Sequence, residues 1–174
     1  RRQERRLEPV SRTEAAPRRR AAILVASTRA AAGIYEDAAG PLLQDWLYAH
    51  GFDVVLAEVV PDGEEVGQAL RRMLALEPSV IITSGGTGIS PTDATPEQTL
   101  PLLDRQVPGV MEALRAYGLS KTPMAALTRG YAGTAGTTFV LNLPGSPSGV
   151  TDSLTVLEPI LGHICGQLEG INEH

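Results

Sequence analysis

Apolar and polar positions change period along the chain, and the change predicts strands and helices in alternation. Continuous apolar runs of strand length occupy residues 21–27, 52–60 and 79–83. Such runs are typical of parallel strands in a sheet that is covered on both faces. Residues 40–50 and 63–76 carry apolar side chains at helical spacing between these runs. The first half of the chain therefore predicts consecutive βαβ units.

The second half predicts two helical pieces, a pair of strands and a final helix. Residues 96–118 give one short and one longer helix, interrupted by Pro101 and Pro108. Strand-like runs at 125–131 and 137–143 flank a glycine-containing loop at 132–136, which indicates a hairpin or a strand pair. The last helix begins near Ser146 and extends to Leu168, with a kink or an unpaired carbonyl expected at Pro159. The expected fold is an α/β three-layer sandwich with a mostly parallel sheet covered by helices on both faces.

Length and charge predict a single domain at residues 21–174, preceded by an Arg-rich extension at 1–20. The extension carries eight Arg against three Glu, which leaves seven basic and seventeen acidic residues, a net charge of −10, in the body of this 174-residue chain. An acidic body excludes nucleic-acid binding through a broad basic face. The extension has no apolar core of a secretory signal, and no segment reaches membrane-spanning length. Cys165 is the single cysteine, which favours a reducing, cytoplasmic location.

Four unusual segments follow predicted strands, at residues 27–29, 61–62, 84–88 and 144–146. The ligand crevice of an α/β sheet lies beyond the carboxyl ends of its strands. If the strands are parallel, all four segments meet at one edge of the sheet. This edge is the expected functional site.

The stretch "SGGTGISPTDATPE", residues 84–97, holds the most distinctive of these segments. Its glycines permit positive φ and let backbone N–H groups approach an anion, as in the nests that bind phosphate. It lacks the Lys-Ser/Thr of a P-loop and breaks the G-x-G-x-x-G fingerprint at the last position. The alternative interpretation is a tight turn after a strand.

Asp62 and Asp93 are the candidate chemical groups at this edge. Two carboxylates beside a phosphate-binding loop suit Mg²⁺, which takes oxygen ligands from carboxylates, phosphates and water. The alternative for Asp62 is an N-cap of the following helix, in a capping box with Glu65. Glu97 is expected to lie in the first turn of its helix, where its negative charge interacts favourably with the helix dipole. The histidines form no ligand pair, so no softer metal is indicated.

No activated nucleophile is predicted. The stretch "GSPSG" at 145–149 resembles a nucleophile elbow, but Pro147 stands where the serine would be. The remaining chemistry is positioning and charge neutralisation, as in phosphoryl or nucleotidyl transfer.

The two stretches "TSGGTGISPTDATPE" and "NLPGSP" together resemble the MogA/MoaB family of molybdenum-cofactor biosynthesis, whose relatives include the G domain of gephyrin. The resemblance covers the body of the chain. It implies adenylylation of molybdopterin by Mg-ATP to give adenylyl-molybdopterin and pyrophosphate, with a homotrimeric assembly and other molybdenum-cofactor enzymes as candidate partners. It also implies that Asp62 and Asp93 are the two functional aspartates. The candidate substrate- and nucleotide-binding residues are Ser27, Arg29, Ser84, Gly85, Gly86, Thr87, Gly88, Thr95, Glu97, Arg129, Pro144, Gly145 and Ser146.

The chain departs from the family pattern at three places that leave alternatives open. Thr28 stands in the family's Ser-Asp-Arg, Ala39 in its Ser-Gly, and Thr128 in its Ser-Arg. The alternatives are a weakly active paralogue, a pterin-binding module without catalysis, and a competence-damage-type domain that handles nucleotide diphosphates. An insertion-type molybdotransferase domain is a further alternative, but it normally comes with additional domains. Arg29 and Arg129 are candidate anion contacts or, alternatively, surface arginines.

Overall fold

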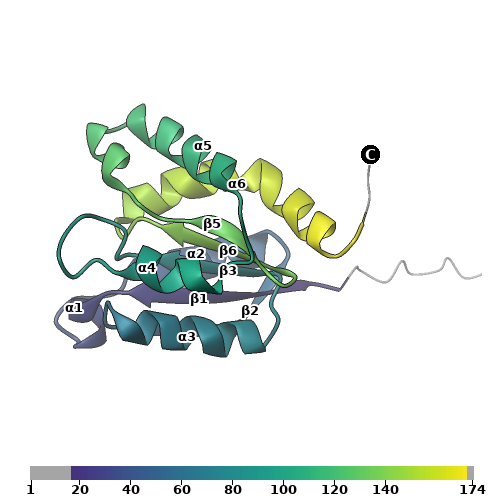
Figure 1. Cartoon of the computed structure of the whole chain (residues 1–174), viewed down its shortest axis with the longest axis horizontal. Coiled ribbons are helices and arrows are strands. Elements are labelled where there is room, and N and C mark those ends of the chain that lie inside the picture. The colour runs from purple at the N-terminus through teal and green to yellow at the C-terminus, as the bar shows by residue number, and fades with distance from the viewer. Residues whose placement is uncertain (1–16, 172–174) are drawn as a thin grey trace, which may run out of the picture.

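A six-stranded sheet runs through the middle of the molecule in the computed structural model, which describes residues 17–171 (Figure 1). Its order is β2-β1-β3-β6-β5-β4. The first four of these strands are parallel, whereas β5 is antiparallel to β6 and β4 is antiparallel to β5. The mostly parallel sheet is therefore confirmed. The strands are β1 (Arg19–Ala26), β2 (Phe52–Val60), β3 (Val80–Ser84), β4 (Arg105–Gln106), β5 (Ala132–Ala135) and β6 (Thr138–Leu143).

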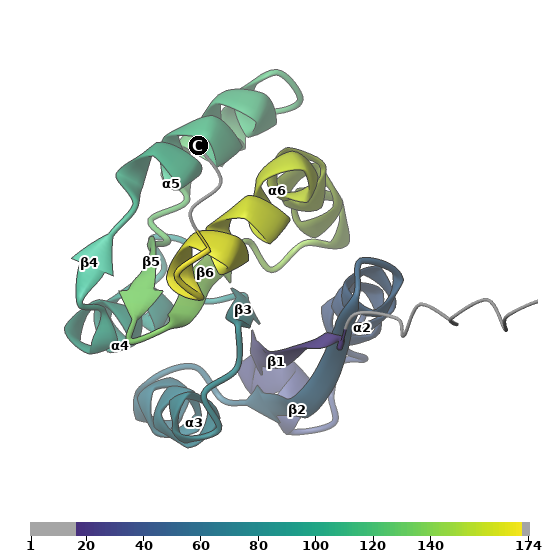
Figure 2. The same cartoon turned by 90° about the vertical axis from the view of Figure 1, so that its right-hand side faces the viewer.

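Helices cover both faces of this sheet (Figure 2). The helices α2 (Ala39–Ala49), α5 (Pro108–Leu119) and α6 (Pro147–Leu168) pack on one face, and α3 (Glu64–Ala75) packs on the other. Short pieces complete the chain: α1 (Thr28–Ala31), α4 (Thr95–Thr99), η1 (Leu100–Leu102) and η2 (Pro123–Leu127). The three-layer sandwich predicted from the sequence is confirmed.

The continuous apolar strands divide their side chains between the two layers. In β1, Ile23 belongs to the core cluster on the side of α2, α5 and α6, while its neighbour Leu24 belongs to the cluster on the side of α3. The same alternation separates Ile82 from Ile81 in β3. Successive side chains of a strand point to opposite faces, so a strand between two helical layers is apolar at every position.

The predicted hairpin exists, but its first strand was placed wrongly. Residues 125–131 form the end of η2 and an irregular segment, and β5 begins only at Ala132. Gly136, with φ of 59°, makes the turn. Gly133 lies inside β5. Only glycine fits at this position, because a Cβ there would overlap the carbonyl oxygen of Arg105 on β4. This glycine therefore marks a close approach of two strands and not a loop.

Three arginines assigned to the N-terminal extension belong to the folded domain. Arg19 and Arg20 are the first residues of β1. Arg18 binds the Asp53 carboxylate (2.7 Å), and Arg19 binds the Glu169 carboxylate (2.7 Å). Residues 1–16, the rest of the predicted extension, lie outside the described part of the chain.

The final helix follows the predicted register. Val150, Leu154, Leu157 and Leu161 are buried along one side of α6, which continues through Pro159. Cys165 is buried on the same side, 1% exposed.

Among residues 17–171, no helix is long and apolar enough to cross a membrane.

The strand order places a topological switch point between β1 and β3. From β1 the chain crosses to β2 on one side, and β3 then lies on the other side of β1. Ligand crevices of open α/β sheets form where such connections diverge, at the carboxyl ends of the strands. The segment after β1 and the glycine loop after β3 border this point.

Candidate functional site

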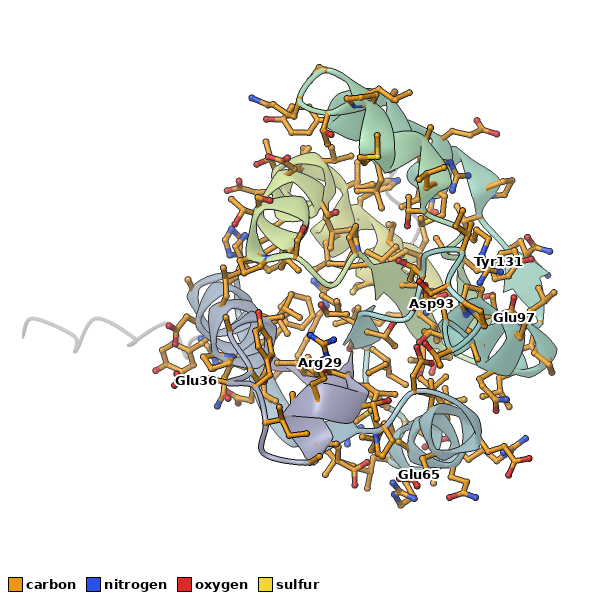
Figure 3. The ribbon with its side chains drawn as sticks, turned by 90° about the vertical axis from the view of Figure 1, so that its left-hand side faces the viewer. Arg29, Glu36, Glu65, Asp93, Glu97 and Tyr131 are labelled. Carbon is orange, nitrogen blue, oxygen red and sulfur yellow. The ribbon has the colours of Figure 1, made fainter. Side chains whose placement is uncertain are left out.

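The segments after β1, β2, β3 and β6 meet at one edge of the sheet, as their parallel direction requires (Figure 3). The amide of Ser27 donates to the carbonyl of Val60 (2.9 Å), which joins the ends of β1 and β2. The Ser84 hydroxyl donates to the Pro144 carbonyl (2.8 Å), which joins the ends of β3 and β6. The hydrogen bonds connect neighbouring strand ends into one surface.

Two consecutive glycines turn the chain away from β3. Gly85 and Gly86 have φ of 97° and 68°, in the left-handed region that glycine adopts without strain. A Cβ at Gly85 would overlap the carbonyl oxygen of Ala26 on β1. The Gly85 amide donates to the Leu143 carbonyl (3.1 Å), so it is not free to bind an anion. Gly85 therefore serves the packing of strand ends, and any anion-binding amides of the loop begin at Gly86.

Asp62 lies against Gly86. Its Oδ1 accepts hydrogen bonds from the amides of Gly63 (2.9 Å) and Ala94 (3.2 Å), while a Cβ on Gly86 would lie 2.7 Å from Oδ2. The predicted capping box is not formed, because Gly63 is the N-cap of α3 and no side chain accepts from the first turn. Asp62 instead ties the loop after β2 to the far end of the glycine loop.

Asp93 closes that loop. Its Oδ2 accepts from the amide of Ser90 (3.0 Å), and its own amide donates to the Ser90 carbonyl (2.9 Å). A Cβ on Gly88 would lie 2.7 Å from Asp93 Oδ2. The two candidate carboxylates therefore lie against Gly86 and Gly88, two residues apart on the same loop.

The Thr95 hydroxyl is a buried polar group without a partner among the described residues. Thr95 is fully buried, and a Cβ on Gly86 would overlap its Oγ1. Its amide donates to the Gly86 carbonyl (3.2 Å), so residue 95 lies directly on the glycine turn. Leaving a buried hydroxyl unpaired is costly. The hydroxyl is thus an available hydrogen-bonding group beside Asp62.

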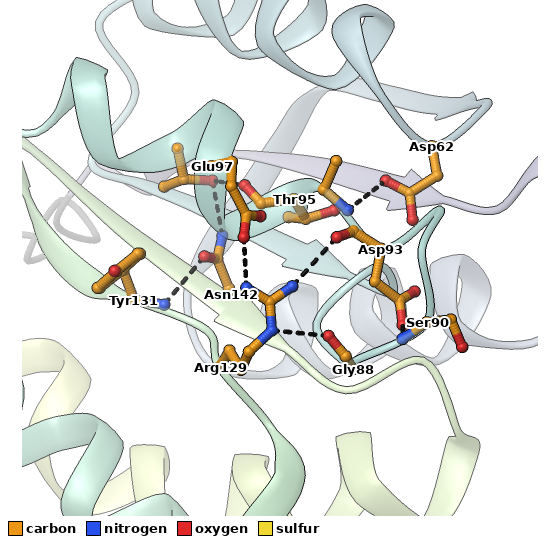
Figure 4. Close-up of polar contacts among 11 residues, drawn as sticks. Asp62, Gly88, Ser90, Asp93, Thr95, Glu97, Arg129, Tyr131 and Asn142 are labelled. Carbon is orange, nitrogen blue, oxygen red and sulfur yellow. Dashed lines mark hydrogen bonds and ion pairs between the residues drawn. The ribbon is translucent and has the colours of Figure 1, made fainter.

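The Arg129 side chain makes three contacts, two with the glycine loop and one with α4 (Figure 4). Its Nε donates to the Gly88 carbonyl (2.8 Å), its Nη2 donates to the Asp93 carbonyl (3.1 Å), and its Nη1 forms an ion pair with Glu97. The Arg129 amide also donates to the Thr87 carbonyl (2.9 Å). The hydrogen bond from Arg129 lowers the pKa of the Glu97 carboxyl below its usual value.

A buried side-chain network lies beneath this loop. Asn142 on β6 donates to the hydroxyls of Thr83 (2.9 Å) and Thr99 (3.1 Å), and its Oδ1 accepts from the Tyr131 amide (3.0 Å). These bonds fix α4 against β3 and β6. Sequence reasoning had not singled out Asn142, although its position as a polar residue within the apolar run of β6 is a readable signal.

Burial and, to a smaller extent, nearby negative charges oppose the ionisation of Asp62. Burial raises the pKa of the Asp62 carboxyl above its usual value, and the negative charges of Asp93 and Glu97 raise it further, against the opposing effect of the two backbone hydrogen bonds. Both effects disfavour the ionised form. A cation bound here would favour the ionised form instead.

Mg²⁺ fits the donors at this place. Asp62 Oδ2 and Asp93 Oδ1 accept no hydrogen bond from any described residue. No group of three or more His, Cys, Asp and Glu side chains among residues 17–171 could hold a metal by itself. A hard cation would take its remaining ligands from phosphate and water, which is the usual arrangement for Mg²⁺.

The remaining candidates fall into two groups. Ser27 and Ser146 accept hydrogen bonds from backbone amides at the start of α1 and α6 (Ala30, 3.2 Å, and Gly149, 3.1 Å). The Arg29 side chain is exposed on the strand-end face, and no described residue forms a hydrogen bond or ion pair with its guanidinium. Arg29 is therefore available to an anion, whereas Arg129 is engaged in the fold.

Two pockets border the candidate site. The first, about 210 Å³, lies at the switch point and includes Ser27, Ser84, Gly86 and Gly145 together with Tyr35 and Asp37, which sequence reasoning missed. Asp37 precedes α2 and accepts from the amides of Ala39 and Gly40, so its sequence signal is that of a helix cap. The second, about 160 Å³, lies between α5 and α6 and is mainly apolar; its lining includes Met111, Leu114, Arg115, Met124, Pro144, Ser146 and Asp152. Pro144–Ser146 thus lies between the mainly apolar pocket and the more polar one at the switch point, which is called the polar pocket below.

The family of the chain follows from comparison with known proteins. Residues 22–163 match the family model described as "Probable molybdopterin binding domain". The chain belongs to this family. The matched range holds all four strand-end segments, so the family assignment covers the complete candidate site. The resemblance to the MogA/MoaB family found in the sequence is confirmed.

Curated relatives of the family match most of the chain. The molybdopterin adenylyltransferase of Haemophilus influenzae is 34% identical over 142 residues, which are 79% of this chain and 72% of the relative. The molybdenum cofactor biosynthesis bifunctional protein of Synechococcus elongatus is 38% identical over 151 residues, which are 86% of this chain but 47% of the relative. The chain thus spans about half the length of that bifunctional relative.

Solved structures share the fold over nearly their whole length. The Mog protein from Mycobacterium ulcerans has a TM-score of 0.83 and 50% identity, and the match covers 86% of this chain and 99% of that one. MoaB from Thermus thermophilus has a TM-score of 0.82 and 43% identity, with 87% and 97% covered. Molybdenum-cofactor biosynthesis is therefore the functional context of the family to which this domain belongs.

Proposed function

We propose that the chain binds molybdopterin and adenylylates it with Mg-ATP, giving adenylyl-molybdopterin and pyrophosphate. One observation carries the proposal: Asp62 and Asp93 lie against Gly86 and Gly88 of the glycine loop, and each keeps a carboxylate oxygen free of hydrogen bonds from described residues. This arrangement suits a Mg-polyphosphate beside a turn of the main chain. The name of the Haemophilus influenzae relative, a molybdopterin adenylyltransferase, supports the same reaction.

In the proposed reaction, a phosphate oxygen of molybdopterin attacks the α-phosphorus of ATP. The bond between the α-phosphorus and the oxygen that bridges to the β-phosphorus breaks, and pyrophosphate leaves with the electron pair of that bond. Mg²⁺, when bound by Asp62 and Asp93, supplies charge neutralisation on the phosphates. The protein contributes by holding the molybdopterin phosphate in line with the α-phosphate of ATP, and by placing hydrogen-bond donors around both phosphates.

The proposed binding roles follow from which groups are free. The Arg29 guanidinium and the backbone amides of Gly86–Gly88, which donate to no described residue, are proposed to contact phosphate oxygens. Ser84, Gly85 and Pro144 shape the loop through the bonds that join β3 and β6. Ser27, Gly145 and Ser146 border the polar pocket or the ends of the helices beside it.

The apolar pocket between α5 and α6 is proposed to accept the ring system of a substrate. Met111, Leu114 and Met124 offer apolar surface to a planar ring, and Asp152 offers a carboxylate to its polar edge. The aminopyrimidinone edge of a pterin presents adjacent N–H donors, which match a carboxylate better than adenine does. The polar pocket at the switch point then remains for the phosphates.

Pyrophosphate release tests the proposed function. The purified chain is mixed with molybdopterin, ATP and Mg²⁺, and the product is analysed by mass for adenylyl-molybdopterin. Turnover that requires all three components is the expected result. Molybdopterin binding without pyrophosphate release would instead indicate the non-catalytic pterin-binding module, and a very slow release would indicate the weakly active paralogue.

We further propose that the chain assembles as a homotrimer. Support comes from the family resemblance and from the exposed apolar side chains near the site, among them Ile34, Ile89 and Met124, which are 79%, 69% and 63% exposed. Sedimentation equilibrium at micromolar concentration is expected to give three times the mass of the chain. A stable monomer would contradict this assembly.

A further inference from the structure

Arg129 lies in the segment after η2, yet it binds both ends of the loop that carries Gly88 and Asp93. The guanidinium bridges the carbonyls of these two residues, which are five positions apart in the sequence. A planar guanidinium fixes the direction of each donor, so the two carbonyls are held in one relative position. The loop between them contains the turn at Ser90 and has no helix or strand of its own.

The same side chain also ties the loop to a neighbouring helix. Nη1 pairs with Glu97 on α4, and the backbone amide of Arg129 bonds to Thr87. The Thr128 hydroxyl donates to the hydroxyl of Thr87 (3.2 Å), adding a second contact from the same segment. Residues 128–129 therefore hold the beginning of the loop, its end and the following helix together.

We propose that Arg129 is a positioning residue that fixes the conformation of residues 87–93, and hence the place of Asp93, through Gly88, Asp93 and Glu97. It does not bind a substrate phosphate. This inference rests on the proposed function in so far as Asp93 acts on the reaction. Arg29, whose guanidinium is exposed and has no partner among the described residues, is the matched comparison because it is proposed to contact phosphate directly.

The two roles predict opposite effects of Glu97→Gln. If Glu97 orients a positioning arginine, removing its charge loosens the loop and lowers kcat. If Arg129 bound phosphate, the same change would release the guanidinium from its acidic partner, and the KM for ATP would fall. Glu97 is half-exposed, with 55% of its side chain accessible, so the variant is expected to keep its fold.

The test combines hydrogen exchange with kinetics on Arg129→Gln, Arg129→Lys, Glu97→Gln, the Glu97→Gln/Arg129→Gln double variant and Arg29→Gln. In the positioning role, Arg129→Gln speeds amide exchange in residues 88–95 and lowers kcat by about 10- to 100-fold, the loss expected from a small displacement of reacting groups. Arg129→Lys restores activity only in part, because one ammonium cannot reproduce the three bonds. The double variant is no worse than Arg129→Gln, because both changes break one cluster.

Arg29→Gln provides the control pattern: a raised KM for ATP with unchanged exchange in residues 88–95. The proposal is overturned if Arg129→Gln shows this same pattern, or if Glu97→Gln lowers the KM for ATP. Glu97→Gln decides the question by itself if Arg129→Gln does not fold. The exchange measurement requires no turnover, so the two proposals can fail separately. An inactive wild-type chain would count against the proposed function. Faster exchange in the variants would still support the proposal that Arg129 fixes the conformation of residues 87–93.

Discussion

The Ala94 amide donates a hydrogen bond to the Asp62 carboxylate at 3.2 Å, which joins the loop after β2 to the end of the loop after β3. Asp62 and Ala94 are 32 residues apart in the sequence. The bond brings Asp62 beside the residue that follows Asp93. A displacement of either loop is therefore expected to move both candidate carboxylates.

Asparagine at the two aspartates separates charge from hydrogen bonding. Asp62→Asn and Asp93→Asn can keep an oxygen toward Ala94 and Ser90, respectively, so both variants are expected to fold. Each removes a negative charge that Mg²⁺ requires, and adenylyl transfer should fall by about 100-fold or more, as when other transition-state contacts are removed. Pyrophosphate release and molybdopterin binding, measured on the same samples, check this.

Asp104→Asn is the matched control for the aspartate pair. Asp104 also accepts a backbone hydrogen bond, from the amide of Gly136 at 2.7 Å. It lies near the amino-terminal end of β6, whereas the candidate site lies at the carboxyl ends of the parallel strands. Its substitution should leave adenylyl transfer unchanged. A folded Asp93→Asn variant that turns over at the wild-type rate would remove the catalytic assignment.

The raised pKa of Asp62 predicts how stability depends on pH. Because the folded state holds this proton more tightly than the unfolded state, the contribution of Asp62 to stability is fully present below its unfolded pKa and is lost as pH rises through the folded pKa. Asp62→Asn, which has no charge to bury, is therefore expected to unfold at an equal or higher temperature than the wild type at neutral pH. The difference should close on acidification below about pH 4. Thermal unfolding across this range, without Mg²⁺, measures it.

Gly86→Ala and Gly136→Ala test the glycine loop against a turn of similar backbone geometry. Both residues have positive φ, 68° and 59°, so each substitution should cost about 1–2 kcal/mol of stability from backbone strain. Only the Gly86 Cβ would overlap Thr95 and crowd Asp62, whereas nothing lies within 4 Å of a Cβ on Gly136. Gly86→Ala should therefore lose substrate binding in calorimetric titrations, and Gly136→Ala should retain it. Equal binding by the two variants would indicate that the glycine loop is only a turn.

Cys165 is expected to resist alkylation in the folded protein. Burial raises the pKa of its thiol to about 11, so the reactive thiolate is scarce at pH 8 and is also shielded by α6 and the sheet. Mass spectrometry after iodoacetamide treatment should show an unmodified chain under native conditions and one adduct in denaturant. Rapid modification of the native protein would contradict the burial of this side chain.

The sequence determined the layers of the fold because the periodicity of its apolar residues reports local backbone geometry. Strands such as 52–60 and helices such as 63–76 agree with the structure to within one residue. The prediction failed at residues 125–136, where the sequence indicated a strand at 125–131 and a glycine-containing loop at 132–136. The position of β5 depends on its pairing with β4, where Gly133 lies against Arg105. These two residues are 28 positions apart in the sequence, so their contact leaves no periodic signal.

The candidate site divides along the same line. The sequence by itself determined that Asp62, Asp93 and the glycine loop follow parallel strands, and hence that they lie at one edge, because parallel strands end together. Only the tertiary structure decided the role of each side chain: it bonded Arg129 to the loop, left Arg29 without a described partner, and left the Thr95 hydroxyl unpaired. The reason is that hydrogen-bonding groups are assigned by distance and direction in space, which depend on how distant segments pack and not on the order of residues along the chain.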